Sequence, residues 1–312
     1  MITKIRIGTR DSELAIWQAN YAKKKLLSLG ISCQIIKLKS EGDLNQITPL
    51  YDFGVSGVFT KILDQALLNN KVDIAVHSLK DVPINLAKGL EINSVFERAD
   101  PYDIVILKNE NIDLSDPLTI ATSSIRRKTQ WLNKYPNHKI VPLRGNVGTR
   151  INKLNKNNWD GAIFAKAGLD RLSIKPKKYS ILNWMIPSAA QGAVAIASKK
   201  DNLDLNKILN SISCKKTFHC VQQERNFLKI MDGGCSSPIS SFAKMNGKNL
   251  TFEVGITCLE GKKSIRIKED FDHNDSKAYL KIYKLLKKKG GDKILNQIKK
   301  KWEKSKFIQL KI

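Results

Sequence analysis

The chain has 312 residues, a length that allows two or three domains, each with its own hydrophobic core. Its 54 lysines and arginines outnumber 29 acidic residues and give a formal net charge of +25. The lysines are scattered through nearly every segment, whereas nucleic-acid-binding proteins usually gather them on one face or tail. We therefore interpret most of the charge as solvated surface lysine, and nucleic-acid binding through this charge stays a minor alternative.

The cysteines form no CxxC pair and no even disulfide framework, so neither a metal site nor a disulfide scaffold is indicated. They are Cys33, Cys214, Cys220, Cys235 and Cys258. This pattern fits a reducing cytosol. Neither a signal peptide nor an apolar stretch of membrane-spanning length is evident. We expect a soluble cytoplasmic protein with no membrane partner.

Strands and helices alternate from the first residues onward. Residues 4–8 predict a strand, and a helix follows to about Leu29, capped by Asp11 or Ser12. Strands are expected at 31–40 and 71–76, with a helix at 59–68 between them. The order strand, helix, strand, helix, strand then recurs at 118–122, 124–135, 139–145, 147–155 and 159–165. Such alternation predicts parallel α/β sheets.

The last third of the chain follows another order. A helix at 215–231 is followed by two predicted strands, at 250–259 and 264–271, and by a lysine-rich helix at about 276–289. Strands and helices that are grouped in this way are typical of an α+β domain. We expect a separate small domain to start near residue 215.

Only ten of the 54 basic residues are arginines. A chain that uses lysine for plain positive charge keeps arginine where a planar fork must hold carboxylates or phosphates. Half of the arginines fall within SSIRR, LRGNVGTR and AGLDR, and a further one lies near the start of the chain in GTRDS. These six are Arg10, Arg126, Arg127, Arg144, Arg150 and Arg171. They predict a small ligand with several negative charges.

Two of these motifs begin a helix directly after a strand, which is where open α/β sheets bind ligands. In SSIRR, the hydroxyls of Ser123 and Ser124 and the following amides could cup an anion. In LRGNVGTR, Gly145 and Gly148 could let the backbone approach it. The alternative for each motif is a capped helix with surface arginines. The absence of a GxxxxGK[ST] loop weakens a nucleotide interpretation.

The segment HSLKDVP delivers His77, Lys80 and Asp81 into a turn set by Pro83. A carboxylate inside a cationic cleft stays ionised, and it suits a reaction that develops positive charge. The alternative is a turn-capping aspartate beside a surface lysine. Cys235 lies in MDGGCSSPIS, where two glycines and a proline predict a tight exposed loop. Its thiol is a candidate nucleophile or attachment point, or else a free surface cysteine.

Taken together, seven segments in register resemble the porphobilinogen deaminase (hydroxymethylbilane synthase) family between residue 8 and about 240. They are GTRDSELAIWQ, HSLKDVP, ATSSIRR, LRGNVGTR, AGLDRL, AAQGAVAIA and GGCSSPI. The resemblance implies a transferase of tetrapyrrole and haem biosynthesis that joins four porphobilinogens into hydroxymethylbilane and releases ammonia. It implies a dipyrromethane cofactor, attached by a thioether to Cys235.

The resemblance also implies roles for individual residues. Asp81 would be the catalytic acid/base and would stabilise the azafulvene-like cation. The cofactor carboxylates would be held by Lys80, Thr122, Ser124, Arg126, Arg127 and Arg150. Substrate or the growing chain would be engaged by Arg10, Ser12, Gln18, Arg144 and Arg171, with Phe59 stacked on a pyrrole ring.

The implied fold has two periplasmic-binding-protein-like α/β domains around a cleft and a smaller α+β C-terminal domain. The expected limits are 1–97 with about 192–212, then 101–188, then 215–312, in a monomer. A binding protein for anionic solutes would use the same two-lobed cleft, but it would need neither Asp81 nor Cys235.

The sequence departs from the family pattern in three regions. Asp52 and Ser56 stand in a loop where lysines are frequent, Ala197 stands where an acidic residue is usual, and Ser240 stands where glycine is expected. Ser240 would strain its turn if that position required a positive φ. We expect slower turnover than in a typical member.

Overall fold

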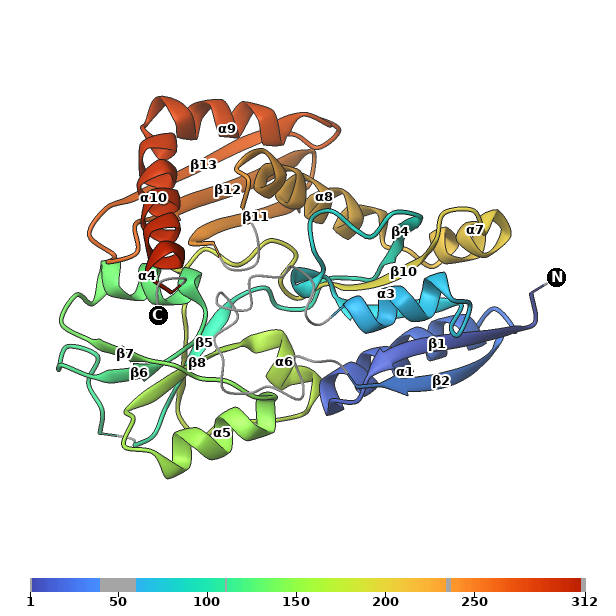
Figure 1. The fold of residues 1–312 in the computed structure, drawn as a ribbon, viewed down its shortest axis with the longest axis horizontal. Helices are drawn as coiled ribbons and strands as arrows, with labels where there is room; N and C mark the ends of the chain where they lie inside the picture. The colour runs from blue at the N-terminus through green and yellow to red at the C-terminus, as the bar shows by residue number, and fades with distance from the viewer. Residues whose placement is uncertain (1, 40–59, 110, 234–236, 310–312) are drawn as a thin grey trace.

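In the computed structural model, the described residues are 2–39, 60–109, 111–233 and 237–309, with only the backbone described from 303 onward. They form two five-stranded sheets and one three-stranded sheet, with helices packed on them (Figure 1). We call the parts built on the two larger sheets lobe 1 and lobe 2, and the part built on the small sheet the third domain.

Lobe 1 has the strand order β2-β1-β3-β10-β4. The strands β1, β2 and β3 are parallel, whereas β10 is antiparallel to both of its neighbours. Its elements are β1 (Lys4–Arg10), α1 (Glu13–Leu27), β2 (Ser32–Leu38), α3 (Lys61–Leu68), β3 (Ile74–Ser78), η2 (Leu79–Asp81), β4 (Leu90–Val95), β10 (Val194–Lys199) and α7 (Leu203–Ser211).

Lobe 2 repeats this topology with the order β7-β6-β8-β5-β9, in which β5 is the antiparallel strand. Its elements are β5 (Asp103–Leu107), β6 (Thr119–Ala121), α4 (Ile125–Lys134), β7 (Lys139–Val141), α5 (Val147–Lys156), β8 (Gly161–Ala165), α6 (Lys166–Arg171) and β9 (Tyr179–Ile181). The sheets are therefore mixed, and the prediction of parallel sheets is wrong for β5 and β10. Each of these strands enters its sheet directly from the other lobe, so no crossover helix forces it to run parallel.

The third domain is an antiparallel sheet of consecutive strands covered by helices. Its elements are α8 (Lys215–Ile230), β11 (Ile239–Asn246), β12 (Asn249–Thr257), β13 (Ser264–Asp272), α9 (Ala278–Lys288) and α10 (Gly291–Gln309). Phe227 of α8 and Phe252 of β12 are fully buried in its core. The α+β prediction is confirmed, although the sequence patterns did not indicate β11 or α10.

The two chain segments that connect the lobes lie side by side, because the Ala99 N–H donates to the Gly192 carbonyl at 3.1 Å. Gly192 has a φ of +85°, and a Cβ there would lie 2.6 Å from the Ala99 oxygen. Arg98 ties this junction to the third domain through an ion pair of 2.6 Å with Glu224, which is completely buried. Glu224 also accepts the Ala190 N–H at 2.6 Å.

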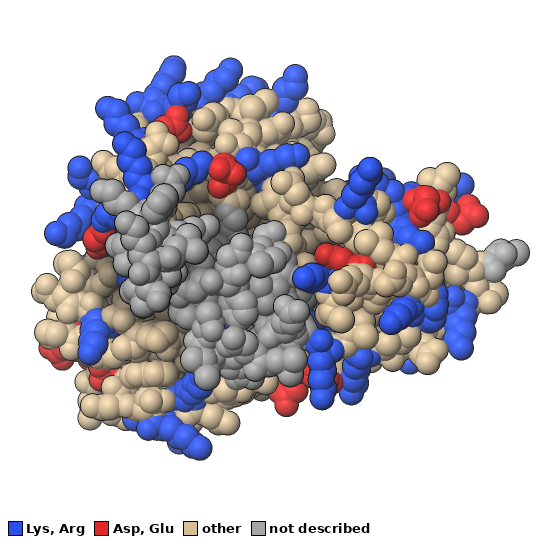
Figure 2. Space-filling view, viewed as in Figure 1, with Lys and Arg blue, Asp and Glu red and all other residues tan. Residues whose placement is uncertain are grey.

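The predicted fold class, with two α/β lobes and a smaller α+β domain, is confirmed by this arrangement. The exact domain limits stay a prediction. On the face shown in Figure 2, Lys and Arg side chains are spread over all three parts, with acidic residues among them. None of the helices in the described ranges combines the length and apolar character needed to cross a membrane.

Candidate active site

A cavity of about 510 Å³ is lined by residues of both lobes and of the third domain. Lobe 1 contributes Arg10, Ser12, Lys80 and Asp81 to its wall. Lobe 2 contributes Thr122, Ser124, Arg126, Arg127, Arg144, Arg150 and Arg171. The third domain contributes Leu228, Ser237 and Ile239. The structure thus brings together eleven of the predicted site residues around one cationic space.

The amino terminus of α4 faces this cavity. Ser124 is the N-cap, and its hydroxyl accepts the Arg127 N–H at 3.4 Å. The Thr122 hydroxyl accepts the Ser124 N–H at 3.2 Å, and the Ser123 hydroxyl accepts the Leu143 N–H at 2.8 Å. The three hydroxyls therefore shape the turn and cap the helix while their residues line the cavity.

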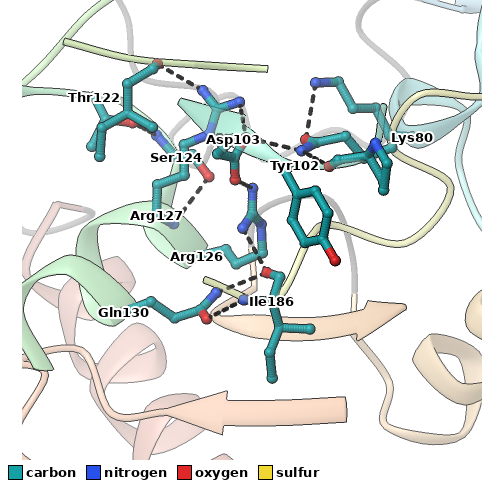
Figure 3. Close-up of polar contacts among 12 residues, drawn as sticks. Lys80, Tyr102, Asp103, Thr122, Ser124, Arg126, Arg127, Gln130 and Ile186 are labelled. Carbon is teal, nitrogen blue, oxygen red and sulfur yellow. Dashed lines mark hydrogen bonds and ion pairs between the residues drawn. The ribbon is translucent and has the colours of Figure 1, made fainter. Parts of the chain in front are cut away.

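Arg126 and Arg127 both bind Asp103, at the first position of β5 (Figure 3). The Arg126 Nη2 lies 2.6 Å from Asp103 Oδ2, and the Arg127 Nη2 lies 2.7 Å from Oδ1. Each guanidinium also donates to a backbone carbonyl, of Ile186 at 2.8 Å and of Ile163 at 3.0 Å. The two arginines are 4% and 6% exposed, and Asp103 is fully buried.

Asp103 is a site residue that the sequence analysis missed. Burial acts to raise the pKa of this carboxyl, but the two guanidiniums outweigh that effect and hold its pKa below the usual range. One carboxylate shared by two arginines leaves one positive charge in excess beside the cavity. A signal existed in the sequence, because an aspartate that opens the apolar strand DIVIL must find a partner when the strand is buried.

Lys80 and Asp81 lie in η2, directly after β3. The Lys80 ammonium donates to Gln191 Oε1 at 3.4 Å (Figure 3). Burial is the main reason why the pKa of Lys80 is lowered to about 8, and Arg126 and Arg127 reinforce it while Asp81 opposes it. Asp81 is partly exposed at the cavity wall.

Arg144 and Arg150 come from the second arginine motif. Asn146 caps α5 by accepting the Thr149 N–H at 2.8 Å, and Gly145 has a φ of +115°. The Arg150 Nε donates to the Gly145 carbonyl at 2.7 Å. Burial, aided by neighbouring arginines and opposed by Asp81, lowers the pKa of Arg150 to about 10.

The two glycines of this motif differ in their position relative to the cavity. Gly145 lines the cavity, whereas Gly148 is absent from its described wall. A Cβ at Gly148 would meet its nearest described neighbour at 3.7 Å, which is ordinary contact. The expectation that Gly148 lets the backbone approach a ligand gains no support from this wall and stays a prediction.

Arg171 joins the two lobes at the edge of the cavity. Its Nη2 donates to the Gly192 carbonyl at 2.6 Å, and its guanidinium carbon lies 5.4 Å from the centre of the Trp17 ring in α1. Cation–π contact of this kind fixes the plane of the guanidinium. Trp17 was not singled out from the sequence.

Gln18 lies beside the main cavity, not in its described wall. It is buried, and its amide donates to the Ser78 hydroxyl at 2.7 Å. It lines a smaller cavity of about 70 Å³, whose wall also includes Arg10, Ser12, Asp81 and His77. Burial, together with Arg10, lowers the pKa of His77 to about 4, so this imidazole is neutral near pH 7.

Cys235 and Phe59 lie outside the described residues, as do Asp52 and Ser56. Ser237, two residues after Cys235, lines the main cavity.

The strain expected at Ser240 is absent. Ser240 pairs with Gly255 in the sheet of the third domain, and it is not among the described non-glycine residues with positive φ. Ala197 is fully buried in β10, opposite Ala75 of β3, so a carboxylate at this position would need a buried partner. The expectation of slow turnover loses its argument from Ser240 and keeps only the argument from the loop.

Comparison with known proteins agrees with this geometry. The family model "Porphobilinogen deaminase, dipyromethane cofactor binding domain" matches residues 5–207, and "Porphobilinogen deaminase, C-terminal domain" matches 218–288. The chain belongs to the porphobilinogen deaminase family. The porphobilinogen deaminase of Lawsonia intracellularis is 36% identical over 94% of this chain and 97% of its own length. That of Rickettsia bellii is 40% identical over 84% and 90%.

Among solved structures, an ancestral cationic amino acid solute binding protein gives a TM-score of 0.46 at 12% identity, over 73% of this chain and 92% of that one. The periplasmic VFT2 domain of Bordetella pertussis BvgS gives 0.43 at 13% identity, over 68% and 87%. At such values neither likeness bears on function.

Proposed function

We propose that this enzyme joins four porphobilinogens into hydroxymethylbilane in the cavity between its lobes, with Asp81 as the catalytic carboxylate. The observation that carries the assignment of the site is the placement of Asp81 in one wall with six arginines and Lys80. Each porphobilinogen carries an acetate and a propionate, so the growing chain accumulates carboxylates that need cations around them.

The residues present fit a dipyrromethane cofactor. A guanidinium has five N–H donors. The bonds described above use two of those of Arg126. Arg127 uses three, because its Nε also donates to Asp103 Oδ1 at 3.1 Å, so both keep donors for ligand carboxylates at the cavity wall. We assign the cofactor carboxylates to Lys80, Thr122, Ser124, Arg126, Arg127 and Arg150. When bound, the cofactor supplies the pyrrole carbon to which the first substrate is joined.

In each cycle one C–N bond breaks and one C–C bond forms. The substrate loses ammonia and leaves a positive charge on its methylene and ring. We propose that the carboxylate of Asp81 stabilises that charge, because an anion held beside a developing cation lowers the barrier. The carbon that attacks the methylene then releases a proton, and we propose Asp81 as its acceptor.

Substrate and growing chain would contact residues of both cavities. Arg10, Ser12 and Asp81 line the main cavity and the smaller one, so the two spaces share a wall. Gln18 would act from the smaller cavity, and Phe59 keeps its proposed stacking role. On the main-cavity side we assign substrate binding to Arg10, Ser12, Arg144 and Arg171.

The deciding experiment is the intact mass of the denatured protein beside a Cys235→Ser variant. We expect an adduct of two porphobilinogen units less two ammonias, absent from Cys235→Ser and present in a Cys33→Ser control. A bare wild-type mass that persists after incubation with porphobilinogen would overturn the covalent cofactor. An adduct that is still present in Cys235→Ser would show that the cofactor is attached to another residue.

We also propose that the enzyme acts as a cytoplasmic monomer. The monomer is what the resemblance to the family implies. The four described cysteines are free thiols, which fits a reducing compartment. Light scattering on the eluting protein would test the monomer, and fractionation of cells would test the compartment.

A further inference from the structure

An arginine of the third domain holds the turn that carries Asp81. Arg225 lies on α8, and its Nη1 donates to the Val82 carbonyl at 2.9 Å while its Nη2 donates to the Pro83 carbonyl at 2.6 Å. Longer bonds of 3.4 Å reach the carbonyls of Leu79 and Ile84. One guanidinium thus binds backbone oxygens on both sides of Asp81.

The turn has few hydrogen bonds within itself, although the Leu79 N–H donates to the Ala193 carbonyl at 3.0 Å. The segment η2 spans three residues, and it is closed by a bond of 3.2 Å from the Val82 N–H to the Leu79 carbonyl. Helical turns of this kind are weak, and Pro83 has no N–H to add. A planar guanidinium is rigid and can bind several carbonyls at once, so it fixes the turn better than a single donor would.

The same helix leads to the loop that contains Cys235. Val221 of α8 packs in one buried cluster with Leu79 and Val82. Further along, Leu228 at the end of α8 and Ser237 after the loop both line the cavity. Helix α8 therefore contacts the Asp81 turn with one part and borders the cofactor side of the cavity with the next.

We propose that Arg225 is a positioning residue, which sets the place of the Asp81 carboxylate relative to the loop that carries Cys235. This inference rests on the proposed function, in which Asp81 is the catalytic carboxylate. The bonds described here join Arg225 to backbone oxygens of the turn, and Arg225 is not among the described residues of the cavity wall, so we place its effect on the turn. A misplacement of about 1 Å at a reacting group lowers a rate about 100-fold.

The test compares Arg225→Met and Arg225→Lys with the wild-type enzyme. Arg266→Met is the matched control, because Arg266 is also an arginine of the third domain that donates to a lobe carbonyl, that of Trp184 at 2.7 Å. We expect kcat to fall about 100-fold in Arg225→Met and about tenfold in Arg225→Lys, with KM nearly unchanged. Arg266→Met should keep its kcat. Intact mass would establish that each variant carries the cofactor.

Coupling to Asp81 separates positioning from general destabilisation. In an Asp81→Glu background the carboxylate is already displaced by one methylene. Arg225→Lys should therefore lower kcat by a much smaller factor there than in the wild type. An equal fold-decrease in kcat on Arg225→Lys in both backgrounds, or an Arg225→Met enzyme with wild-type kcat, would overturn the inference. A wild-type kcat in Asp81→Glu and Asp81→Asn would instead remove Asp81 from the proposed function, whatever Arg225 does.

Discussion

The Nη2 atom of Arg127 lies 2.7 Å from Oδ1 of Asp103, and neither side chain has appreciable contact with solvent. Since Arg126 binds the other oxygen of the same carboxylate, Asp103 orients two guanidiniums at once. It also offsets one of their two charges, which would otherwise repel each other in a buried place. The cationic wall of the cavity is therefore built on a buried anion that is not itself among the described wall residues.

Asp103→Asn tests this dependence. The change leaves two buried arginines without a counter-charge, and removal of one partner from a buried pair typically costs about 3–5 kcal/mol. We expect a loss of stability of this size in urea unfolding, together with incomplete cofactor content by intact mass. Asp204→Asn, at an exposed pair with Lys207 on α7, is the control and should change stability by less than about 1 kcal/mol. A stable, fully loaded Asp103→Asn enzyme would contradict the structural role of Asp103.

Lys80 gives a prediction in pH. The pKa of its ammonium, ordinarily 10.5, is lowered to about 8 by the protein groups. Between these values the unfolded chain binds the proton and the folded chain does not, so this group makes folding more favourable as the pH rises from about 8. Ligand carboxylates beside Lys80 would stabilise the ammonium and raise its pKa again.

The measurement is an NMR titration of lysines labelled by reductive ¹³C-methylation, with Lys80→Arg to assign the signal. We expect a midpoint near pH 8 in Cys235→Ser, which cannot attach the cofactor, and a higher midpoint in the loaded wild type. Equal midpoints would mean that no cofactor carboxylate lies beside Lys80.

Asp81→Asn should separate catalysis from folding. The variant keeps the shape of the side chain and loses the charge that would stabilise the substrate cation and accept its proton. Loss of a general acid or base typically lowers kcat about 10²–10⁴-fold. Because Asp81 is partly exposed on a short turn, we expect cofactor content and melting temperature to stay close to wild type. Asp116→Asn, an exposed change of the same kind in lobe 2, should leave kcat as it was.

The sequence predicted the cationic side of the site well, because SSIRR and LRGNVGTR each follow a strand and begin a helix. Strand ends and helix starts are local features that residue order shows directly. The sequence analysis missed Asp103 because its partners lie 23 and 24 positions away in the chain, and only the fold brings them together. Strand β10 was missed for the same reason, since it pairs with β4 and β3 across roughly 100 and 120 residues.

Strand β11 shows a second limit. Its sequence ISSFAKMN has two serines directly after the first residue and looks like a continuation of the loop. In the fold both serines are buried, and the Ser241 hydroxyl donates to the Glu224 carbonyl at 3.3 Å. A hydroxyl that donates to a distant backbone oxygen can be buried at a small cost in free energy. The local pattern of polar residues does not reveal such a hydrogen bond.

Ser240→Gly examines the departure from the family pattern next to the Cys235 loop. Ser240 has ordinary strand geometry opposite Gly255, and its hydroxyl donates to the Gly255 carbonyl at 3.4 Å. A Cβ at Gly255 would lie 2.8 Å from Ile186 Cδ1, so the partner position stays small and leaves Ser240 its space. Glycine in a strand interior costs about 0.5–1 kcal/mol of backbone entropy and here gains no relief of strain.

We therefore expect Ser240→Gly to lower stability by about 0.5–1 kcal/mol in urea unfolding and to leave kcat unchanged. Ser240→Ala is the matched control, because it removes the same hydroxyl and keeps the backbone restricted. It should lose less stability than Ser240→Gly, since the bond it removes is long. A faster Ser240→Gly enzyme would show that the serine does restrain the loop that carries Cys235, and would restore the argument for slow turnover from this residue.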